Sequence, residues 1–421
     1  MTVFDELESN VRYYCRQWPA VFASALGATL VDETGKAYID FFSGAGALSY
    51  GHNNPFLVEV AIEHLRGGRV THSLDTHTPE KREFLEALRD RVLAPRDLDM
   101  VVQFVGPTGA TAVEAALKLA ERITGRGSTV AYEGGYHGMT AGAASVSASL
   151  DNRDELSGRR SIFLPHVARH DDAERARLKS ALQTPVDGQL PGALIIEPIQ
   201  GDGGARPFDP DYLGEVRRLC THYGAIVIAD EVQAGVGRTG PFFSFEGSGL
   251  DPDIICLSKS LSGLGLPLAV NLVRRELDRW VPGEFTGTFR GNNLAFATAT
   301  ALLQLYWRDR ALEQSTARRG QLVRRALEEL ANEEGVAPFA VHGKGLMWGL
   351  DFEDGATAAA VVTAAFRIGL IVETCGSDKS TVKLLPSLLI EDDELATGLD
   401  RLKDAVRLAT DDPQPIDPLS L

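Results

Sequence analysis

Short apolar runs alternate with helical patterns between about Val101 and Val273. The run MVVQFVG predicts a strand, and PTGATAVEAALKLAERITG predicts a helix that ends at Gly125. Four later runs are apolar throughout and of strand length: GALIIEPI, GAIVIADEV, DIICLS and LAVNLV. Continuous apolar runs are typical of parallel strands that are covered on both faces. This region therefore predicts an α/β domain built on a mostly parallel sheet. One face of the predicted helix carries Ala112, Ala115, Ala116 and Leu119.

The pattern changes after Asn293, where a long helical stretch is followed by short strands and helices. This change predicts a second, smaller α+β domain. Near the N-terminus, ATLVDETGKAYIDF predicts a hairpin with its turn at Glu33, Thr34 and Gly35. The tail is rich in Pro and Asp, which favours disorder. We therefore expect an N-terminal segment at 1–45 that packs with the small domain, a large domain at 46–293, the small domain at 294–408 and a disordered tail at 409–421.

The composition fits a globular chain of two domains, with 421 residues, 44% apolar and 24% charged. A formal net charge of −16 argues against a nucleic-acid partner, because such proteins carry a basic footprint. The acidic N-terminus predicts no signal peptide, and no apolar run is long enough to span a bilayer. The cysteines have neither the spacing of a zinc site nor that of a disulfide framework, and they fit a reducing cytoplasm. They are Cys15, Cys220, Cys256 and Cys375.

Polar residues follow several of the apolar runs, at the strand ends where α/β sheets bind ligands. Asp230 ends one run and Glu197 ends another. A buried carboxylate needs a partner, which a cationic ring nitrogen, a helix N-terminus or an ordinary salt bridge would supply. Lys259 follows IICLS, and taken alone it is more typical of a strand-end lysine whose ammonium reaches water than of a functional residue.

Two glycine-rich segments add further polar groups. VGPTGATA leads from a strand into a helix, and such a turn directs backbone amides and the helix dipole at one spot, as phosphate sites do. No lysine follows in P-loop spacing, so a nucleotide P-loop is not indicated, and an ordinary tight turn is the alternative. YEGGYHGMT supplies Tyr136 and His137.

Pyridoxal phosphate would use all of these groups together. Lys259 would form an imine with the aldehyde, and Asp230 would keep the pyridine nitrogen protonated so that the ring accepts electrons. Tyr136 would stack on the ring, and the turn at Gly109 and Ala110 would hold the phosphate.

Several motifs occur in an order that resembles the class III (subgroup II) aminotransferases of the fold-type I pyridoxal-phosphate enzymes. The resemblance extends from about Leu7 to Leu408. It implies a large domain with a mostly parallel, seven-stranded type of sheet and a smaller α+β domain. Each motif is weak alone, and the ordered set is specific: DFFSGAGALSYGHNNP, GPTGATAVEAALKLA, GGYHGMT, IIEPIQGDGG, IADEVQAGVGRTG, LSKSLSG and GTFRGNN.

The resemblance also implies a role for each matching residue. Lys259 is the Schiff-base lysine and proton shuttle, and Asp230 pairs with the pyridine nitrogen. Thr288 matches a threonine that reaches the phosphate of the neighbouring subunit, which implies a homodimer with shared active sites and leaves a tetramer open. Glu197 matches a glutamate that gates the substrate pocket. The other cofactor contacts that it implies are Gly109 and Ala110 at the phosphate, Tyr136 stacked with His137 beside it, Val232 on the ring and Gln233 near the ring hydroxyl.

Within the class, the chain most resembles the diaminobutyrate–2-oxoglutarate aminotransferases of ectoine biosynthesis. Two positions depart from the patterns. Lys383 stands where many class III relatives have an arginine that grips the substrate α-carboxylate, and lysine lacks the bidentate fork. The ectoine subfamily also has lysine there. Ser49 stands where that subfamily has asparagine, in a stretch that lies near the substrate pocket of the family.

The resemblance implies reversible, ping-pong transfer of an amino group between L-glutamate and L-aspartate 4-semialdehyde, with L-2,4-diaminobutyrate and 2-oxoglutarate as products. Alternatives are another ω-aminotransferase acting on ornithine, 4-aminobutyrate, lysine or a natural-product amine, and an aminomutase or decarboxylase on the same scaffold. The third alternative is a regulatory protein that binds the cofactor without catalysing a reaction. The chain has no added basic domain and keeps both Asp230 and Lys259, which argues against a regulator. No metal site is indicated.

Overall fold

The computed structural model describes residues 2–148 and 161–411. Its large domain is built on a seven-stranded sheet with the strand order β4-β12-β11-β10-β7-β5-β6. The predicted strands at MVVQFVG, ALII, AIVIAD and IICL are all present in this sheet. The strands are β4 (Met100–Gly106), β5 (Thr129–Tyr132), β6 (Ser161–Leu164), β7 (Ala193–Ile196), β10 (Ile226–Asp230), β11 (Ile254–Leu257) and β12 (Ala269–Arg274).

Alternate residues of the central strands enter two separate cores. Ile195 and Ile228 pack on the face covered by α5 (Gly109–Thr124), together with the predicted alanine face of that helix. Leu194 and Val227 point to the opposite face, into the larger core. Because both sets of side chains are buried, these strands need apolar residues at every position. The helices that cover the second face are α4 (Pro79–Leu88), α8 (Asp172–Gln183), α9 (Pro210–Tyr223) and α10 (Asn293–Tyr306).

The direction of β12 corrects one prediction. The apolar pattern of LAVNLV predicts another parallel strand, but β12 runs antiparallel to both β11 and β4. A parallel return requires a crossover of a dozen or more residues, usually through a helix. Between Leu257 and Ala269 the chain has room only for the single-turn η3 (Lys259–Ser262), so it turns back beside β11.

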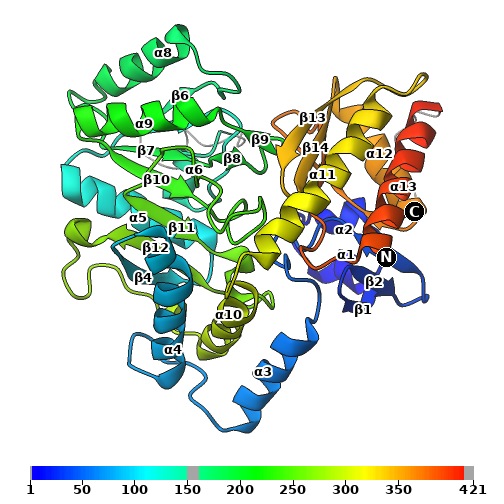
Figure 1. Ribbon diagram of the computed structural model, residues 1–421, viewed down its shortest axis with the longest axis horizontal. Coiled ribbons are helices and arrows are strands. Elements are labelled where there is room, and N and C mark those ends of the chain that lie inside the picture. The colour runs from blue at the N-terminus through cyan, green and yellow to red at the C-terminus, as the bar shows by residue number, and fades with distance from the viewer. Residues whose placement is uncertain (1, 149–160, 412–421) are drawn as a thin grey trace.

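The small domain combines the C-terminal part of the chain with its beginning (Figure 1). Four strands form one sheet in the order β13-β14-β17-β16. A second sheet has the order β1-β2-β3-β15, and its predicted hairpin pairs Thr29 with Ile39. β3 pairs in parallel with β15, so we assign the N-terminal segment to this domain. The strands are β1 (Phe22–Leu26), β2 (Thr29–Asp32), β3 (Ala37–Asp40), β13 (Phe339–Lys344), β14 (Met347–Phe352), β15 (Leu370–Ile371), β16 (Glu373–Cys375) and β17 (Thr381–Leu384).

Three long helices complete this domain, and two short helices open the chain. They are α11 (Ala311–Ala331), α12 (Gly355–Arg367) and α13 (Asp392–Asp411), with α1 (Val3–Leu7) and α2 (Tyr14–Gln17) at the beginning. Residues 409–411 of the expected disordered tail belong to α13. Residues 412–421 of that tail lie outside the described residues.

The boundary expected at Asn293 differs from the packing. The long helical stretch is two helices, and Figure 1 shows α10 beside α4 and α3 (Pro55–Arg66), below the large sheet. Phe296 of α10 stacks on Phe84 of α4 with ring centroids 5.6 Å apart. A short non-helical segment at 307–310 separates this buried helix from the amphipathic α11. We therefore place the domain boundary between α10 and α11.

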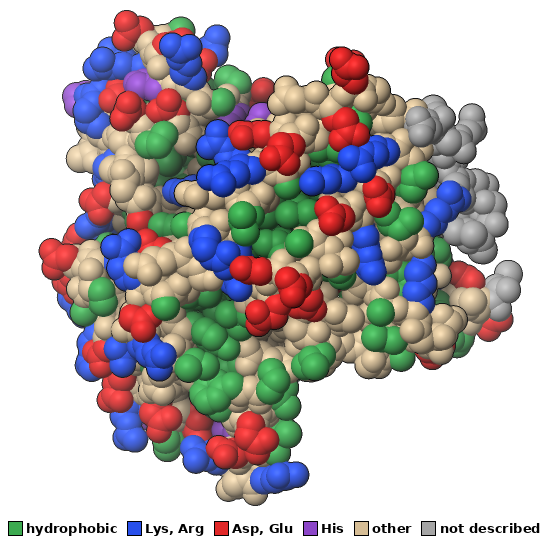
Figure 2. Space-filling view, turned by 45° about the vertical axis from the view of Figure 1, so that its right-hand side comes forward, with side chains coloured by type: hydrophobic (Ala, Val, Ile, Leu, Met, Phe, Trp, Pro, Cys, Tyr) green, Lys and Arg blue, Asp and Glu red, His purple; other side chains and the backbone are tan. Residues whose placement is uncertain are grey.

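Charged residues are dispersed over the face of the molecule that Figure 2 shows. On the face shown in Figure 2, Lys and Arg side chains alternate with Asp and Glu, so the negative net charge is not gathered into one acidic area there. Surface pairs of this kind contribute little to stability individually. Within residues 2–148 and 161–411, no helix has the length and apolar character needed to cross a membrane.

Candidate active site

A cleft of about 830 Å³ opens at the carboxyl ends of β7, β10 and β11, where a parallel sheet binds its ligands. Most of the predicted site residues line it, and Ser49 and Thr288 do not. The lining includes Gly109, Ala110, Tyr136, His137, Glu197, Asp230, Val232, Gln233, Lys259 and Lys383.

Lys259 lies at the base of the cleft, at the first position of η3. Its backbone φ is 44°, in the left-handed region that non-glycine residues seldom occupy and that clusters at functional sites. Burial and the nearby Lys383 ammonium lower the pKa of Lys259 to about 8, although Glu373, Asp230 and Glu197 act in the opposite direction. This amine is therefore far more available as a free base than an exposed lysine.

Asp230 is 4% exposed, at the end of β10. One of its oxygens, Oδ2, lies 2.7 Å from Nδ1 of His137, and Oδ1 accepts the amide hydrogen of Val232 at 3.0 Å. Burial opposes a charged imidazole, but the hydrogen bond and charge of Asp230 raise the pKa of His137 overall. The carboxylate thus has a polar neighbour and still faces the cleft, where a cationic ring nitrogen would be its partner.

Glu197 fixes the loop that carries Tyr136. Its carboxylate accepts hydrogen bonds from the backbone amides of Tyr136 and Gly201, each at 2.9 Å. Burial raises the pKa of Glu197 to about 7, and the nearby Asp230 adds to this, while His137 lowers it. Glu197 therefore positions the aromatic residue at the rim of the cleft, in addition to lining the cleft itself.

The turn before α5 has the form of a phosphate cradle. Thr108 caps the helix by accepting the amide of Thr111, and the first helical amides lack a carbonyl partner four residues earlier. A Cβ on Gly109 would lie 2.8 Å from Cγ1 of Val232, and one on Gly138 would lie 2.6 Å from Cβ of Ala110. Only glycine fits these two positions, and the backbone consequently lies directly against the cleft. An anion is favoured at such a helix start.

Gln233 is expected near the ring hydroxyl of the cofactor, and in the structure its side chain also contacts two other residues. Its side-chain amide donates to the carbonyl oxygen of Ala45 at 2.9 Å, and its oxygen accepts from Lys383 at 3.4 Å. Gln233 therefore connects the predicted cofactor wall with the part of the cleft that Lys383 lines.

The placement of Ser49 corrects the prediction that it borders the substrate pocket. Ser49 is fully buried behind the cleft wall. Its hydroxyl lies 2.5 Å from that of Ser260 and 2.8 Å from a guanidinium nitrogen of Arg238, which is itself completely buried. The short polar side chain packs behind the segment that carries Lys259, so it supports this segment from within the core.

Several cleft residues escaped the sequence analysis. Tyr13 and Tyr14 lie in ESNVRYYCR, a stretch that resembles the diaminobutyrate subfamily but was assigned no role, and Glu373 comes from β16, where no motif marks it. Asp202 lies in the motif IIEPIQGDGG and could have been found from it. Tertiary packing alone brings Glu373 to the cleft.

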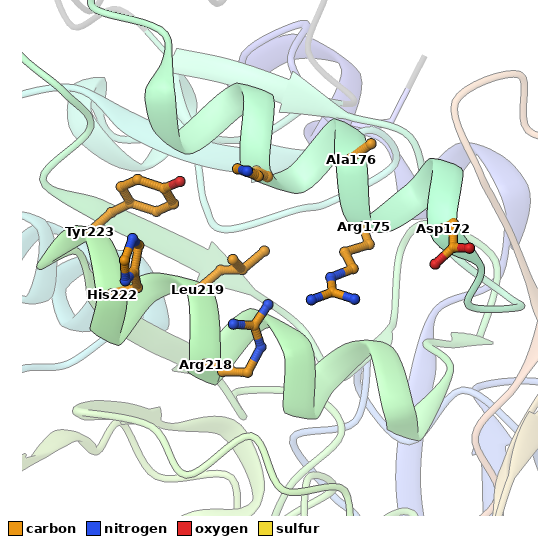
Figure 3. Close-up of a pocket in the computed structure, with 8 residues that line it drawn as sticks. Asp172, Arg175, Ala176, Arg218, Leu219, His222 and Tyr223 are labelled. Carbon is orange, nitrogen blue, oxygen red and sulfur yellow. The ribbon is translucent and has the colours of Figure 1, made fainter.

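A second cavity, of about 350 Å³, lies between α8 and α9 (Figure 3). The guanidinium groups of Arg175 and Arg218 lie between the two helices, and both pair with Glu215, at 2.8 and 2.6 Å. None of the predicted cofactor residues lines this cavity. The large cleft is therefore the candidate active site.

Comparisons with known proteins show which proteins have a similar sequence. The family model "Aminotransferase class-III" matches residues 14–406. The diaminobutyrate–2-oxoglutarate transaminase of Nocardia farcinica (strain IFM 10152) is 48% identical over 414 residues, which cover 96% of this chain and 93% of the relative. The enzyme of that name from Streptomyces anulatus is 45% identical, with 97% and 98% covered.

Solved structures agree with the sequence comparisons. An aminotransferase of Bacillus anthracis superposes with a TM-score of 0.84 at 26% identity, covering 96% of this chain and 99% of that one. An ornithine aminotransferase of Toxoplasma gondii superposes with a TM-score of 0.83 at 25% identity, covering 97% and 94%. Pyridoxal phosphate partially occupies the active site of that ornithine aminotransferase.

Proposed function

This chain belongs to the class-III aminotransferases, and we propose that it transfers an amino group reversibly between L-glutamate and L-aspartate 4-semialdehyde, giving L-2,4-diaminobutyrate and 2-oxoglutarate. The aminotransferase activity, the fold of type I and the dependence on pyridoxal phosphate follow from the family. The substrate pair is supported by the names of the similar proteins from Nocardia and Streptomyces.

The observation that carries the proposal is that Lys259, Asp230 and the turn at Gly109 and Ala110 line one cleft. These residues fit the cofactor: the turn for its phosphate, Asp230 for its ring nitrogen, Val232 for its ring and Lys259 for its aldehyde. When bound, pyridoxal phosphate supplies an electron sink for the carbon that carries the amino group. Glycine at positions 109 and 138 lets the backbone lie directly against the cleft, since a Cβ there would collide with Val232 or Ala110.

The protein's own residues would hold and move the proton. With its pKa lowered to about 8, the amine of Lys259 can accept a proton near neutral pH and return it, as a general base and acid must. His137 and the amide of Val232 orient Asp230 toward the cleft, and Glu197 holds the loop of Tyr136. A base in hydrogen-bond reach of the substrate carbon contributes roughly 10²–10⁴-fold to a rate.

The proposal includes a homodimer in which Thr288 serves the partner's site. Thr288 lies in η5 (Thr288–Arg290) and does not line the cleft of its own chain. Around it and at the cleft mouth, large apolar side chains are exposed: Leu74 at 45%, Met139 at 66% and Phe289 at 68%. Exposed apolar groups of this kind mark interaction surfaces when they cluster.

A cytoplasmic location also belongs to the proposal and is supported by free cysteines at positions 220, 256 and 375 that are buried.

An absorbance titration tests the substrate. The holoenzyme is titrated with L-2,4-diaminobutyrate in the absence of any keto acid, and the visible band of the bound aldehyde form is expected to convert to that of the amine form. Ornithine and 4-aminobutyrate, at equal concentration, should convert it far more slowly. A Lys259→Ala variant should fail to convert. Faster conversion by ornithine or 4-aminobutyrate would show a different ω-aminotransferase.

A further inference from the structure

A buried ion pair lines the cleft in the small domain. Glu373 of β16 and Lys383 of β17 lie directly opposite each other in the antiparallel register. The Lys383 ammonium is 3.1 Å from Oε1 of Glu373, and the two side chains are 2% (Lys383) and 3% (Glu373) exposed. Although burial opposes the charged form, the Glu373 carboxylate raises the pKa of Lys383 well above its ordinary value. Lys383 is thus already paired and is not a free cation waiting for a substrate carboxylate.

The oxygen of Glu373 that faces Lys383, Oε1, does not form an aligned hydrogen bond with any of the described residues. Burial and the charge of Glu373 also raise the pKa of the neighbouring Tyr14, which keeps that phenol neutral. A carboxylate oxygen has more than one acceptor position, so Oε1 can accept a further hydrogen bond from a ligand while Lys383 stays beside it. Glu373 lines the cleft, so a ligand can reach it.

This wall of the cleft carries more negative than positive charge. Lys383 faces two carboxylates, because Asp202 lies 4.0 Å away on its other side. Another cation, Lys379, is exposed at the rim, where it lies 5.7 Å from the ring of Tyr13. The wall therefore presents both members of a buried ion pair to the cleft, with the Lys383 ammonium available to a carboxylate and the Glu373 carboxylate available to an ammonium group. A zwitterionic amino-acid head matches this arrangement.

We propose that Glu373 is a specificity-determining residue that accepts the α-ammonium group of a diamino acid whose ω-nitrogen lies at Lys259. Lys383, held in place by Glu373, faces the α-carboxylate of the same substrate. The inference rests on the proposed function, because it takes L-2,4-diaminobutyrate as the substrate. It explains how a lysine that is already paired contributes to recognition: the pair binds both charges of the head group, and neither residue acts as a lone grip.

Two analogues separate the two charges. Removing the α-ammonium from diaminobutyrate gives 4-aminobutyrate, and removing the α-carboxylate gives 1,3-diaminopropane, while the reacting end stays the same. Dissociation constants for all three are measured by calorimetry in the Lys259→Ala holoenzyme, which cannot turn over, with and without Glu373→Gln. Conversion of the cofactor band gives the corresponding rates in the enzyme that keeps Lys259.

Glu373→Gln keeps the shape of the side chain and removes its charge. The preference for diaminobutyrate over 4-aminobutyrate is expected to fall by about 10- to 100-fold, as for a hydrogen bond to a charged group. Binding of 4-aminobutyrate should change less than that of diaminobutyrate, because this ligand lacks the α-ammonium group and is affected by Glu373 only through Lys383. Glu353→Gln, which alters an exposed carboxylate outside the cleft, is the matched control and should leave the preference unchanged.

The outcomes distinguish the inference from the function on which it rests. An equal loss for all three ligands would reduce Glu373 to a structural partner of Lys383 and overturn the inference. An unchanged preference would do the same. If the unaltered enzyme does not prefer diaminobutyrate to 4-aminobutyrate at all, the proposed substrate itself is wrong.

Discussion

The lysine at the base of the cleft depends on its surroundings for reactivity. Since the folded protein lowers the pKa of Lys259 to about 8, the amine should lose its proton well below pH 10.5, the ordinary value for lysine. In the cofactor-free protein, acetylation of Lys259 is expected to rise with a midpoint near pH 8. Peptide mass spectrometry after brief exposure to acetic anhydride measures this, with the exposed Lys179 as internal reference.

Lys383→Met provides the directional control for this titration. It removes the nearest cation and leaves Glu373 and Asp202 uncompensated, and both changes favour protonated Lys259. The midpoint should therefore move to higher pH. A midpoint near 10.5 in the unaltered protein would contradict the environment described for this amine.

Sequence reasoning located some residues of the site and missed others for a physical reason. Lys259, Asp230 and Glu197 follow apolar strands, and a polar residue at a strand end is visible in the sequence. Glu373 reaches Lys383 through the register of two short strands, and local sequence does not specify such a pairing. Ser49 faces the core instead of the pocket, because a motif gives the position of a residue without the direction of its side chain.

At the scale of elements, the close approach of α5 to the segment after β10 constrains the phosphate cradle. Gly109→Ala would place a methyl group 2.8 Å from Val232, at a position where the backbone itself tolerates alanine. Overpacking of this kind costs roughly 1–3 kcal/mol. We expect a loss of cofactor affinity of about 5- to 100-fold by that figure, measured by quenching of protein fluorescence, with a lower melting temperature.

A double-mutant cycle identifies the contact as the cause. Val232→Ala removes the methyl groups that collide, so the double variant should bind the cofactor more tightly than Gly109→Ala alone. Additive losses would mean that the two residues act independently and that the close approach does not limit the cradle.

The elements themselves were predictable where burial determines the pattern. Continuous apolar runs identified β7, β10 and β11, and the alanine face with Gly125 identified α5. The direction of β12 was not predictable from its own composition, because a strand that is buried on both faces has the same pattern in either direction. The break between α10 and α11 was missed since both segments have helical periodicity.

For the whole molecule, the active site depends on both domains. Lys259 and Asp230 come from the large domain, whereas Glu373 and Lys383 come from the small one, and Tyr14 comes from the N-terminal segment. The proposed cofactor end and the proposed head-group end of the cleft are thus formed by different parts of the chain. Sites at such boundaries are common, because two rigid domains can position groups that no single element brings together.

The proposed dimer makes the most demanding prediction, since each site would need residues from two subunits. Thr288→Val, which removes only the hydroxyl, should weaken cofactor binding in its homodimer, and Lys259→Ala should abolish turnover. In mixed dimers of the two variants, one site would combine the intact Lys259 of one subunit with the intact Thr288 of the other. Co-expression with two different tags isolates these mixed dimers. Their turnover per dimer should approach half of the unaltered value, and one site per dimer should bind the cofactor with unaltered affinity.

The matched control uses a residue that serves its own chain. Gly109→Ala lies on the same polypeptide as the Lys259 with which it shares a cleft. A mixed dimer of Gly109→Ala with Lys259→Ala therefore has one defect in each site, and it should gain nothing over the separate variants. Recovery with Thr288→Val but not with Gly109→Ala assigns the threonine to the partner's site. Equal behaviour of the two mixtures would mean that Thr288 acts within its own subunit or not at all, and the shared-site arrangement would be wrong.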